Sequence, residues 1–89
     1  MALFDLLGRR WTLRVLWELR SEPLTFRRLQ ARCEEMSSSV LNQRLRELRD
    51  AGVVEQQRGE GYGLTPEGQA LLDSLKPLSA WADRWSARS

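Results

Sequence analysis

The chain has 89 residues, 42% of them hydrophobic, and its 14 basic and 12 acidic side chains give a net charge of +2. These values are typical of one soluble globular domain, which we assign to residues 1–89. There is no histidine and a single cysteine, Cys33, which excludes an internal disulfide and the Ser-His and Cys-His pairs of nucleophilic catalysis. The carboxylates do not cluster at metal-ligand spacing. We therefore expect no enzyme activity and no bound metal or cofactor.

The sequence lacks the long apolar segments of a membrane protein. No apolar run approaches the roughly 18 residues that a membrane helix needs. The first residues, Met1 to Asp5, carry neither the basic region nor the cleavage site of a secretory signal. We therefore expect a cytoplasmic protein without membrane contact. Its basic side chains are thirteen arginines and one lysine. A GC-rich genome also raises arginine content, so the positions of the arginines carry more information than their number.

Two short helices are predicted at the beginning of the chain. The first is indicated by the apolar side chains Leu3, Phe4, Leu6 and Leu7. The second begins near Trp11 and ends before Pro23, because the residue before a proline avoids helical geometry. The i, i+3, i+4 spacing of a buried helical face is found at Leu13, Leu16 and Trp17.

A third helix is predicted after a short extended piece at residues 24–26. Thr25 suits its N-terminal cap, since a threonine hydroxyl accepts a hydrogen bond from a free N–H of the first turn. Phe26 and Leu29 form its inner face, which either Ala31 or Cys33 closes. We expect Cys33 to be a structural core residue with no regulatory part.

The segment from residue 37 to residue 54 is the most informative in the chain. It begins with serines, places Leu41, Leu45 and Leu48 on one face, and ends at Gly52, a residue typical of helix C-termini. The opposite face carries Ser39, Asn42, Gln43 and Arg46, with Arg49 nearby. Amides match adenine, arginine matches guanine, and serines at a helix N-terminus match phosphate. This favours a helix that reads the DNA major groove, against a solvated face that carries two amides by chance.

Arginines around this helix are candidates for contact with the DNA backbone. We expect phosphate contacts from Arg10, Arg27, Arg28, Arg49 and Arg58, and we note Arg9 and Arg32 as neighbours with the same chemistry. Such contacts position a protein without reading sequence. The alternative for each arginine is an ordinary surface charge that pairs with a carboxylate.

A β-hairpin and a final helix complete the chain. The hairpin has a strand over residues 53–58, a reversal at residues 59–61 where glycine accepts positive φ, and a strand over residues 62–64. Thr65, Pro66 and Glu67 predict the helix start: a cap, a proline at the first position and an acid at the positive dipole end. An apolar stripe then runs through Leu71, Leu72, Leu75, Leu78, Trp81, Ala82 and Trp85. Pro77 kinks or restarts this helix.

This order predicts a mainly α fold with a small β-hairpin wing (α+β), the winged helix-turn-helix. The third helix and the serine-headed helix are its DNA-reading pair. We expect a core built from Leu13, Leu16, Leu29, Leu41, Leu45, Leu48 and Leu71.

Several motifs occur in a characteristic order. Residues 6–12, LLGRRWT, are similar to LLGGKWT, and residues 37–48 are similar to SPKVLTQRLREL. Phe26 and Leu29 match RFxEL, residues 52–54 match GLV, and residues 62–68 match YSLTELG. Trp81 adds the tryptophan of a last helix. Together these motifs resemble the HxlR family of bacterial winged-helix transcription regulators, a branch near the MarR and PadR proteins.

The resemblance implies a homodimer with terminal dimerisation helices and a central helix in the major groove. Carried onto this chain, it makes Ser38, Ser39, Asn42, Gln43 and Arg46 groove-facing. It makes Leu3, Leu7, Leu78, Trp81 and Trp85 dimer contacts. The chain departs from the family in lacking the cysteine before the first helix, in its shorter hairpin and in Ser38 where proline is usual. Electrophile sensing and minor-groove contact by the wing therefore stay open.

We predict a sequence-specific transcription regulator that binds double-stranded DNA as a homodimer through the helix at residues 38–50. The alternative is a winged-helix module for protein association without specific DNA binding. Residues 25–50 carry six arginines and four acids, which favours DNA. A small-molecule effector is not identifiable from the sequence. The four tryptophans, Trp11, Trp17, Trp81 and Trp85, suit a core or an interface better than a ligand pocket.

Overall fold

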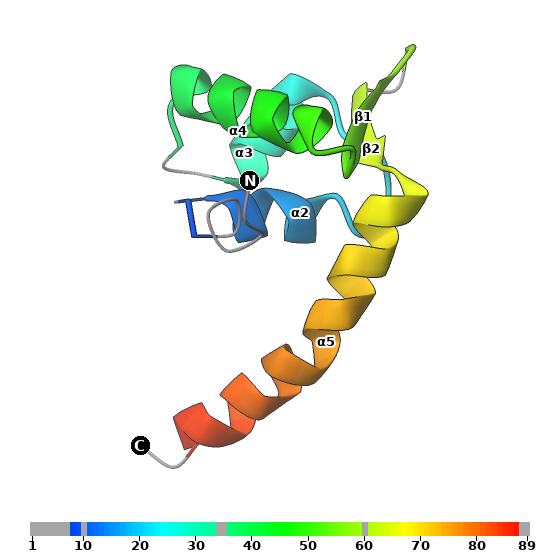
Figure 1. Cartoon of the computed structure of the whole chain (residues 1–89). Coiled ribbons are helices and arrows are strands. Elements are labelled where there is room, and N and C mark those ends of the chain that lie inside the picture. Colours follow the sequence, from blue (N-terminus) through cyan, green and yellow to red (C-terminus); the bar gives the residue numbers. More distant parts are fainter. Residues whose placement is uncertain (1–7, 10, 34–35, 60, 88–89) are drawn as a thin grey trace.

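The computed structural model describes residues 8–9, 11–33, 36–59 and 61–87. In chain order these contain α2 (Thr12–Glu18), α3 (Phe26–Arg32), α4 (Ser38–Asp50), β1 (Val54–Gln57), β2 (Gly61–Leu64) and α5 (Pro66–Ala87). Helices α2, α3 and α4 pack together beside the hairpin, and α5 extends away from them (Figure 1). The predicted mainly α architecture with a hairpin wing is confirmed. The predicted apolar helix at Leu3–Leu7 lies outside the described residues.

Hydroxyl side chains begin three of the helices. Thr25 Oγ1 accepts a hydrogen bond from Arg28 N at 3.2 Å, and Ser37 Oγ accepts one from Val40 N at 3.2 Å. Thr65 Oγ1 accepts from Gly68 N at 3.0 Å and donates to the Gly52 carbonyl oxygen at 2.6 Å. Each cap satisfies a backbone N–H that has no partner within its helix. The predicted caps of α3 and α5 are therefore confirmed.

The C-terminus of α4 turns the chain directly into the wing. Gly52 holds φ at +79°, where an L side chain is strained. Its N–H donates to the Arg49 carbonyl at 3.0 Å, and the Val53 N–H donates to the Leu48 carbonyl at 3.1 Å. This bonding pattern is the Schellman motif. It brings buried Val53 against buried Leu48 and starts β1 at the edge of the core.

The wing is a two-stranded antiparallel hairpin braced by the segment before α3. Val54 pairs with Leu64 and Gln57 with Gly61, so β1 is shorter than the predicted strand over residues 53–58. Leu24 forms a bridge to Tyr62, with N–H to carbonyl bonds of 2.9 and 2.7 Å. A Cβ at Gly61 would lie 2.2 Å from the Leu24 carbonyl oxygen, so this close approach requires glycine.

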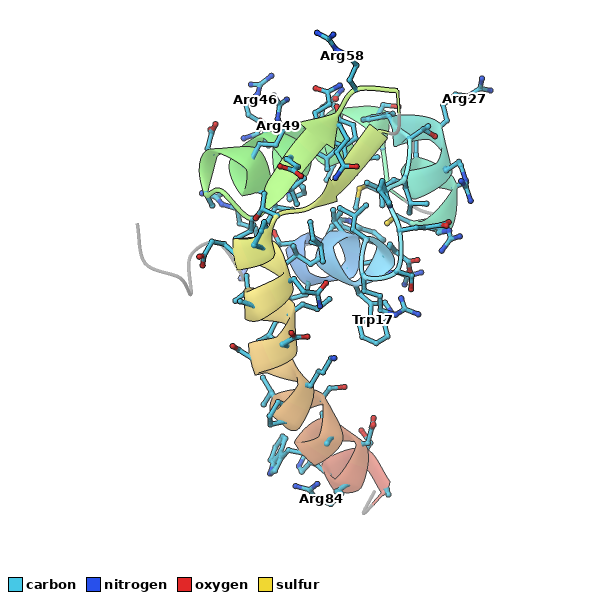
Figure 2. The ribbon with its side chains drawn as sticks, turned by 90° about the vertical axis from the view of Figure 1, so that its right-hand side faces the viewer. Trp17, Arg27, Arg46, Arg49, Arg58 and Arg84 are labelled. Atoms are coloured by element: carbon cyan, nitrogen blue, oxygen red, sulfur yellow. The ribbon has the colours of Figure 1, made fainter. Side chains whose placement is uncertain are left out.

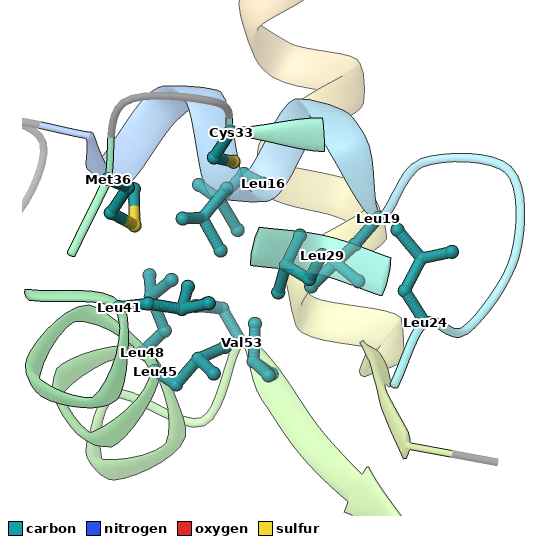
Figure 3. Packing of buried hydrophobic residues seen from close by; sticks show 12 residues of the cluster. Leu16, Leu19, Leu24, Leu29, Cys33, Met36, Leu41, Leu45, Leu48 and Val53 are labelled. Atoms are coloured by element: carbon teal, nitrogen blue, oxygen red, sulfur yellow. The ribbon is translucent and has the colours of Figure 1, made fainter. Parts of the chain in front are cut away.

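The core lies between the three short helices and the base of the hairpin (Figure 3). Its buried side chains are Val15, Leu16, Leu19, Leu24, Leu29, Cys33, Met36, Leu41, Leu45, Leu48, Val53 and Val54. Of the predicted core leucines, the five at positions 16, 29, 41, 45 and 48 are confirmed. Leu71 is half-buried, and its neighbour Leu72 is buried, as is Gly68 in the first turn of α5.

The predicted buried face of α2 is wrong at two of its three positions. Leu13 and Trp17 are each 46% exposed, whereas Val15 and Leu16 are fully buried. Helix α2 has only seven residues, and the packing of α3 and α4 decides which side of it is covered. Leu13 and Trp17 lie instead on the side that α5 faces.

Helix α5 continues through Pro77 without interruption from Pro66 to Ala87. The proline therefore does not restart the helix, and α5 curves along its length (Figure 1). A proline inside a helix removes one N–H bond and crowds the carbonyl four residues earlier, which bends the axis. None of the described helices is long and apolar enough to cross a membrane.

Candidate nucleic-acid interface

Helix α4 separates apolar and polar side chains onto two faces. Leu41, Leu45 and Leu48 are buried in the core. The side chains predicted to face bases are all exposed: Ser38, Ser39, Asn42, Gln43 and Arg46. Arg49 is exposed as well. The polar face is therefore presented to solvent along the first two turns of the helix, the part that contacts bases when such helices bind DNA.

Gln30 connects α3 to the first turn of α4. Its amide nitrogen donates one hydrogen bond to Ser38 Oγ at 2.9 Å and a second, longer one to the Met36 carbonyl oxygen at 3.4 Å. The hydroxyls of Ser37 and Ser39 lie 3.3 Å apart in the same turn. The sequence reasoning missed Gln30, because a glutamine within a short helix has no pattern that marks a contact to the next helix.

Glu47 accepts two hydrogen bonds and forms an ion pair with a third side chain at the edge of the polar face. Its carboxylate accepts from Gln43 Nε2 at 3.1 Å and from Arg44 Nη1 at 2.5 Å. Arg9 Nε lies 3.4 Å from Glu47 Oε2. Gln43 and Arg44 are neighbours on α4, whereas Arg9 comes from the segment before α2. The sequence reasoning did not assign a role to Glu47.

The arginines of the described residues divide into those with a carboxylate partner and those without one. Arg9, Arg14, Arg28, Arg32 and Arg44 each lie within ion-pair distance of a carboxylate. Six arginines of the described residues have no such partner: Arg20, Arg27, Arg46, Arg49, Arg58 and Arg84. Arg20 instead contacts the carbonyl oxygen and the ring of Trp17. Figure 2 shows Arg27, Arg46, Arg49 and Arg58 at the end of the molecule where α3, α4 and the wing meet, and Arg84 near the tip of α5. Four of the six arginines without a carboxylate partner therefore lie at the end that carries the polar face of α4.

The arginines predicted to contact phosphate include some with a carboxylate partner and some without one. Arg27, Arg49 and Arg58 are exposed and unpaired among the described residues. Arg28 pairs with Glu22 at 3.3 Å, with both side chains more than half exposed. An exposed pair of this kind is worth little and exchanges readily for another anion. Arg10 lies outside the described residues.

The side chains predicted as dimer contacts on α5 are exposed. Leu78, Trp81 and Trp85 are 60%, 51% and 57% exposed, and the two indole rings stack with centroids 5.9 Å apart. The inner side of α5 and the exposed side of α2 line an open apolar groove of about 600 Å³ that includes Leu13, Trp17, Leu72, Leu75 and Leu78. Leu3 and Leu7 lie outside the described residues.

Cys33 is fully buried in the core at the C-terminus of α3. Burial raises the pKa of its thiol above the ordinary value, which outweighs the lowering effect of nearby Arg14. The thiolate is the reactive form of cysteine. A buried thiol with a raised pKa carries little thiolate at neutral pH, in keeping with the structural role predicted for it.

The fold and the polar helix define a winged helix-turn-helix protein of the kind that binds DNA. Residues 6–89 match the HxlR-like helix-turn-helix family, and the chain belongs to that family. It is 34% identical to the uncharacterised HTH-type transcriptional regulator YvaP of Bacillus subtilis, over 91% of this chain and 81% of YvaP. These findings confirm the predicted family and fold class.

Solved structures give the same assignment. The quinone-bound form of YodB from B. subtilis superimposes with a TM-score of 0.84, at 34% identity over 91% of each chain. A protein from Thermoplasma volcanium described as a possible HxlR family transcriptional factor superimposes with a TM-score of 0.85, at 27% identity over 98% of this chain and 84% of that one. The named relatives are transcriptional regulators, so the prediction of a regulator rather than an enzyme is confirmed.

Proposed function

We propose that this protein is a sequence-specific transcription regulator that binds double-stranded DNA as a homodimer, with α4 in the major groove. One observation carries the proposal: the exposed polar face of α4 lies at the same end of the molecule as Arg27, Arg46, Arg49 and Arg58, four of the six arginines that have no carboxylate partner among the described residues (Figure 2). The fold supplies a rigid support for that face, because three buried leucines fix α4 to the core. The site of action would be the cytoplasm.

Each exposed group has a defined task in this proposal. Asn42, Gln43 and Arg46 read base edges, since amides match adenine and guanidinium matches guanine. Ser38 and Ser39 lie in the first turn of α4, where free N–H groups and the helix dipole favour a phosphate. Arg27, Arg49 and Arg58 extend the positive surface to both sides of α4 and bind the DNA backbone. Arg10 and Arg28 are assigned the same task, Arg28 after exchange of its partner Glu22.

The homodimer is proposed from the apolar side of α5. Leu78, Trp81 and Trp85 expose a continuous hydrophobic surface. Such a surface on a soluble domain marks an interaction site. The groove beside it, lined by Leu13 and Trp17, is the apolar surface available to receive the rings of a second copy. A two-fold dimer would present two α4 helices about 34 Å apart, which matches successive major grooves on one side of a duplex.

DNA selection tests this proposal. The purified protein is incubated with a random duplex pool at low salt, and the bound sequences are recovered. The affinity of the protein for each recovered sequence is then measured by fluorescence anisotropy. We expect a two-fold symmetric motif and a loss of about 1–3 kcal/mol for Arg46→Ala, with relaxed preference at one base pair of each half-site. Arg84→Ala is the matched control, because it removes the same charge at the far end of α5 (Figure 2). Failure of the wild-type protein to retain any DNA would reject the proposal and favour a protein-association module.

A further inference from the structure

We propose that Glu47 is a positioning residue for base recognition: it holds the Gln43 amide in the orientation that reads adenine, and Arg9 anchors Glu47 from outside α4. This inference rests on the proposed function, in which Gln43 faces the bases. It assigns a task to two side chains that do not themselves lie among the base-facing residues.

The geometry around Glu47 uses both carboxylate oxygens. Arg44 donates to Oε1 at 2.5 Å, while Gln43 Nε2 donates to Oε2 at 3.1 Å. Arg9 Nε approaches that same Oε2 at 3.4 Å. The side chains of Glu47 and Arg44 are only 17% and 15% exposed, so most of this ion pair is shielded from solvent, whereas the Arg9 side chain is 51% exposed. Gln43 itself is exposed on the polar face.

The contact with Glu47 determines which way the Gln43 amide faces. A carboxylate only accepts hydrogen bonds, so the amide nitrogen must turn toward Glu47 and the amide oxygen must turn away. An amide nitrogen has two N–H bonds, and one of them remains beside the oxygen. That N–H and that oxygen are the pair that adenine requires at its N7 and N6 positions. Glu47 therefore selects one of two amide orientations before DNA arrives and reduces the ordering cost of binding.

Arg9 and Arg44 make a carboxylate tolerable on this face. An unpaired negative charge beside the phosphates would repel DNA, whereas Glu47 has a guanidinium at each oxygen. Arg44 holds it within α4. Arg9 holds it from a segment that is itself fixed to α2, because the Arg9 carbonyl accepts from Thr12 N at 3.3 Å. The orientation of Gln43 thus depends on where the start of α2 lies relative to α4.

Base preference measured position by position tests the inference. The selected DNA site is varied at each base pair, and affinities are compared for the wild type, Gln43→Ala, Glu47→Ala, Glu47→Gln and Arg9→Ala. Asp73→Ala is the matched control, since Gln69 donates to Asp73 at 3.0 Å with the same i, i+4 spacing on α5. Circular dichroism establishes that each variant is folded.

We expect Gln43→Ala to lose roughly tenfold preference at one base pair of each half-site. Glu47→Ala should lose about three- to tenfold at that same base pair, with no loss of affinity for non-preferred DNA. Adding Glu47→Ala to Gln43→Ala should cause no further loss at that position. Glu47→Gln, which keeps an acceptor oxygen, should retain more preference than Glu47→Ala, and Arg9→Ala should lose preference in the same direction.

Several results would overturn the inference. Preference that disappears in Gln43→Ala but persists in Glu47→Ala would reject it while leaving the proposed function standing. A loss spread evenly over all positions, or the same loss in Asp73→Ala, would do so too. A wild-type protein that binds no DNA would reject both this inference and the proposed function. Without DNA, the Gln43 side-chain NH₂ signals in a ¹⁵N NMR spectrum should shift in Glu47→Ala and in Arg9→Ala; unchanged signals would also reject the inference, even where one variant folds poorly.

Discussion

Replacing both Trp81 and Trp85 with glutamate should convert the proposed dimer into a folded monomer. The residues are 51% and 57% exposed, so the core does not depend on them. A tryptophan buries about 150–250 Å² when fully covered, which leaves roughly 100 Å² of each ring available to a partner. At about 25 cal/mol per Å², covering two rings on both protomers contributes about 10 kcal/mol to association before ordering costs are subtracted.

Loss of this contribution to association should change the oligomeric state of the protein. Sedimentation at micromolar concentration should give a dimer for the wild type and a monomer for the double variant, with an unchanged helical signal in circular dichroism. Affinity for a two-half-site DNA should fall sharply, because each monomer then binds one half-site alone. Arg84→Glu, on the same helical turn, alters charge without removing apolar area and should remain dimeric. A wild-type monomer, or a double variant that still dimerises, would refute the assignment of this surface.

The remaining predictions concern the DNA backbone, the cysteine and the helix caps. Arg27→Ala should weaken binding to all sequences alike and lower the salt slope of the affinity by about one, as measured by anisotropy at several salt concentrations. Cys33→Ala should keep DNA affinity, and peroxide should not change binding in either protein; a peroxide effect that disappears in Cys33→Ala would contradict this. Because burial raises the folded-state pKa of Cys33 above its ordinary value, the contribution of the thiol to stability should be complete below the ordinary pKa of a free thiol and should decline as the pH rises above it, as followed by denaturant unfolding. Ser37→Ala should lower the free energy of unfolding by about 1 kcal/mol, since the first turn of α4 loses its cap.

Local chemistry made much of the fold predictable from the sequence. Thr25 and Thr65 begin helices because their hydroxyls satisfy free N–H groups in the next turn, a requirement set by residues three positions apart. Gly52 ends α4 because only glycine enters φ near +79° without strain. The i+4 and i+7 spacing of Leu41, Leu45 and Leu48 fixed which face of α4 is buried, and with it the candidate DNA-reading face.

The errors arise where distant segments decide the outcome. Leu13 and Trp17 have the spacing of a buried face, yet α2 is too short for its own periodicity to select the covered side. The contacts of Gln30 with Ser38 and of Arg9 with Glu47 join different elements. No spacing rule along the chain encodes them. The base-facing and dimer assignments stay predictions, because they concern molecules beyond this chain.

The small net charge of +2 is compatible with DNA recognition because of how the charges are paired. Carboxylates engage Arg9, Arg14, Arg28, Arg32 and Arg44. Of the six arginines without a carboxylate among the described residues, Arg20 lies over Trp17 and Arg84 lies near the tip of α5, whereas Arg27, Arg46, Arg49 and Arg58 lie together. The unpaired positive charge is thus greatest at one end. Few phosphates would be neutralised, each adding about 0.9 to the salt slope, so non-specific affinity would be modest. Discrimination between DNA sequences then depends on well-oriented base contacts. A carboxylate that orients Gln43 improves such a contact, and this gain outweighs the presence of a negative charge on a DNA-binding face.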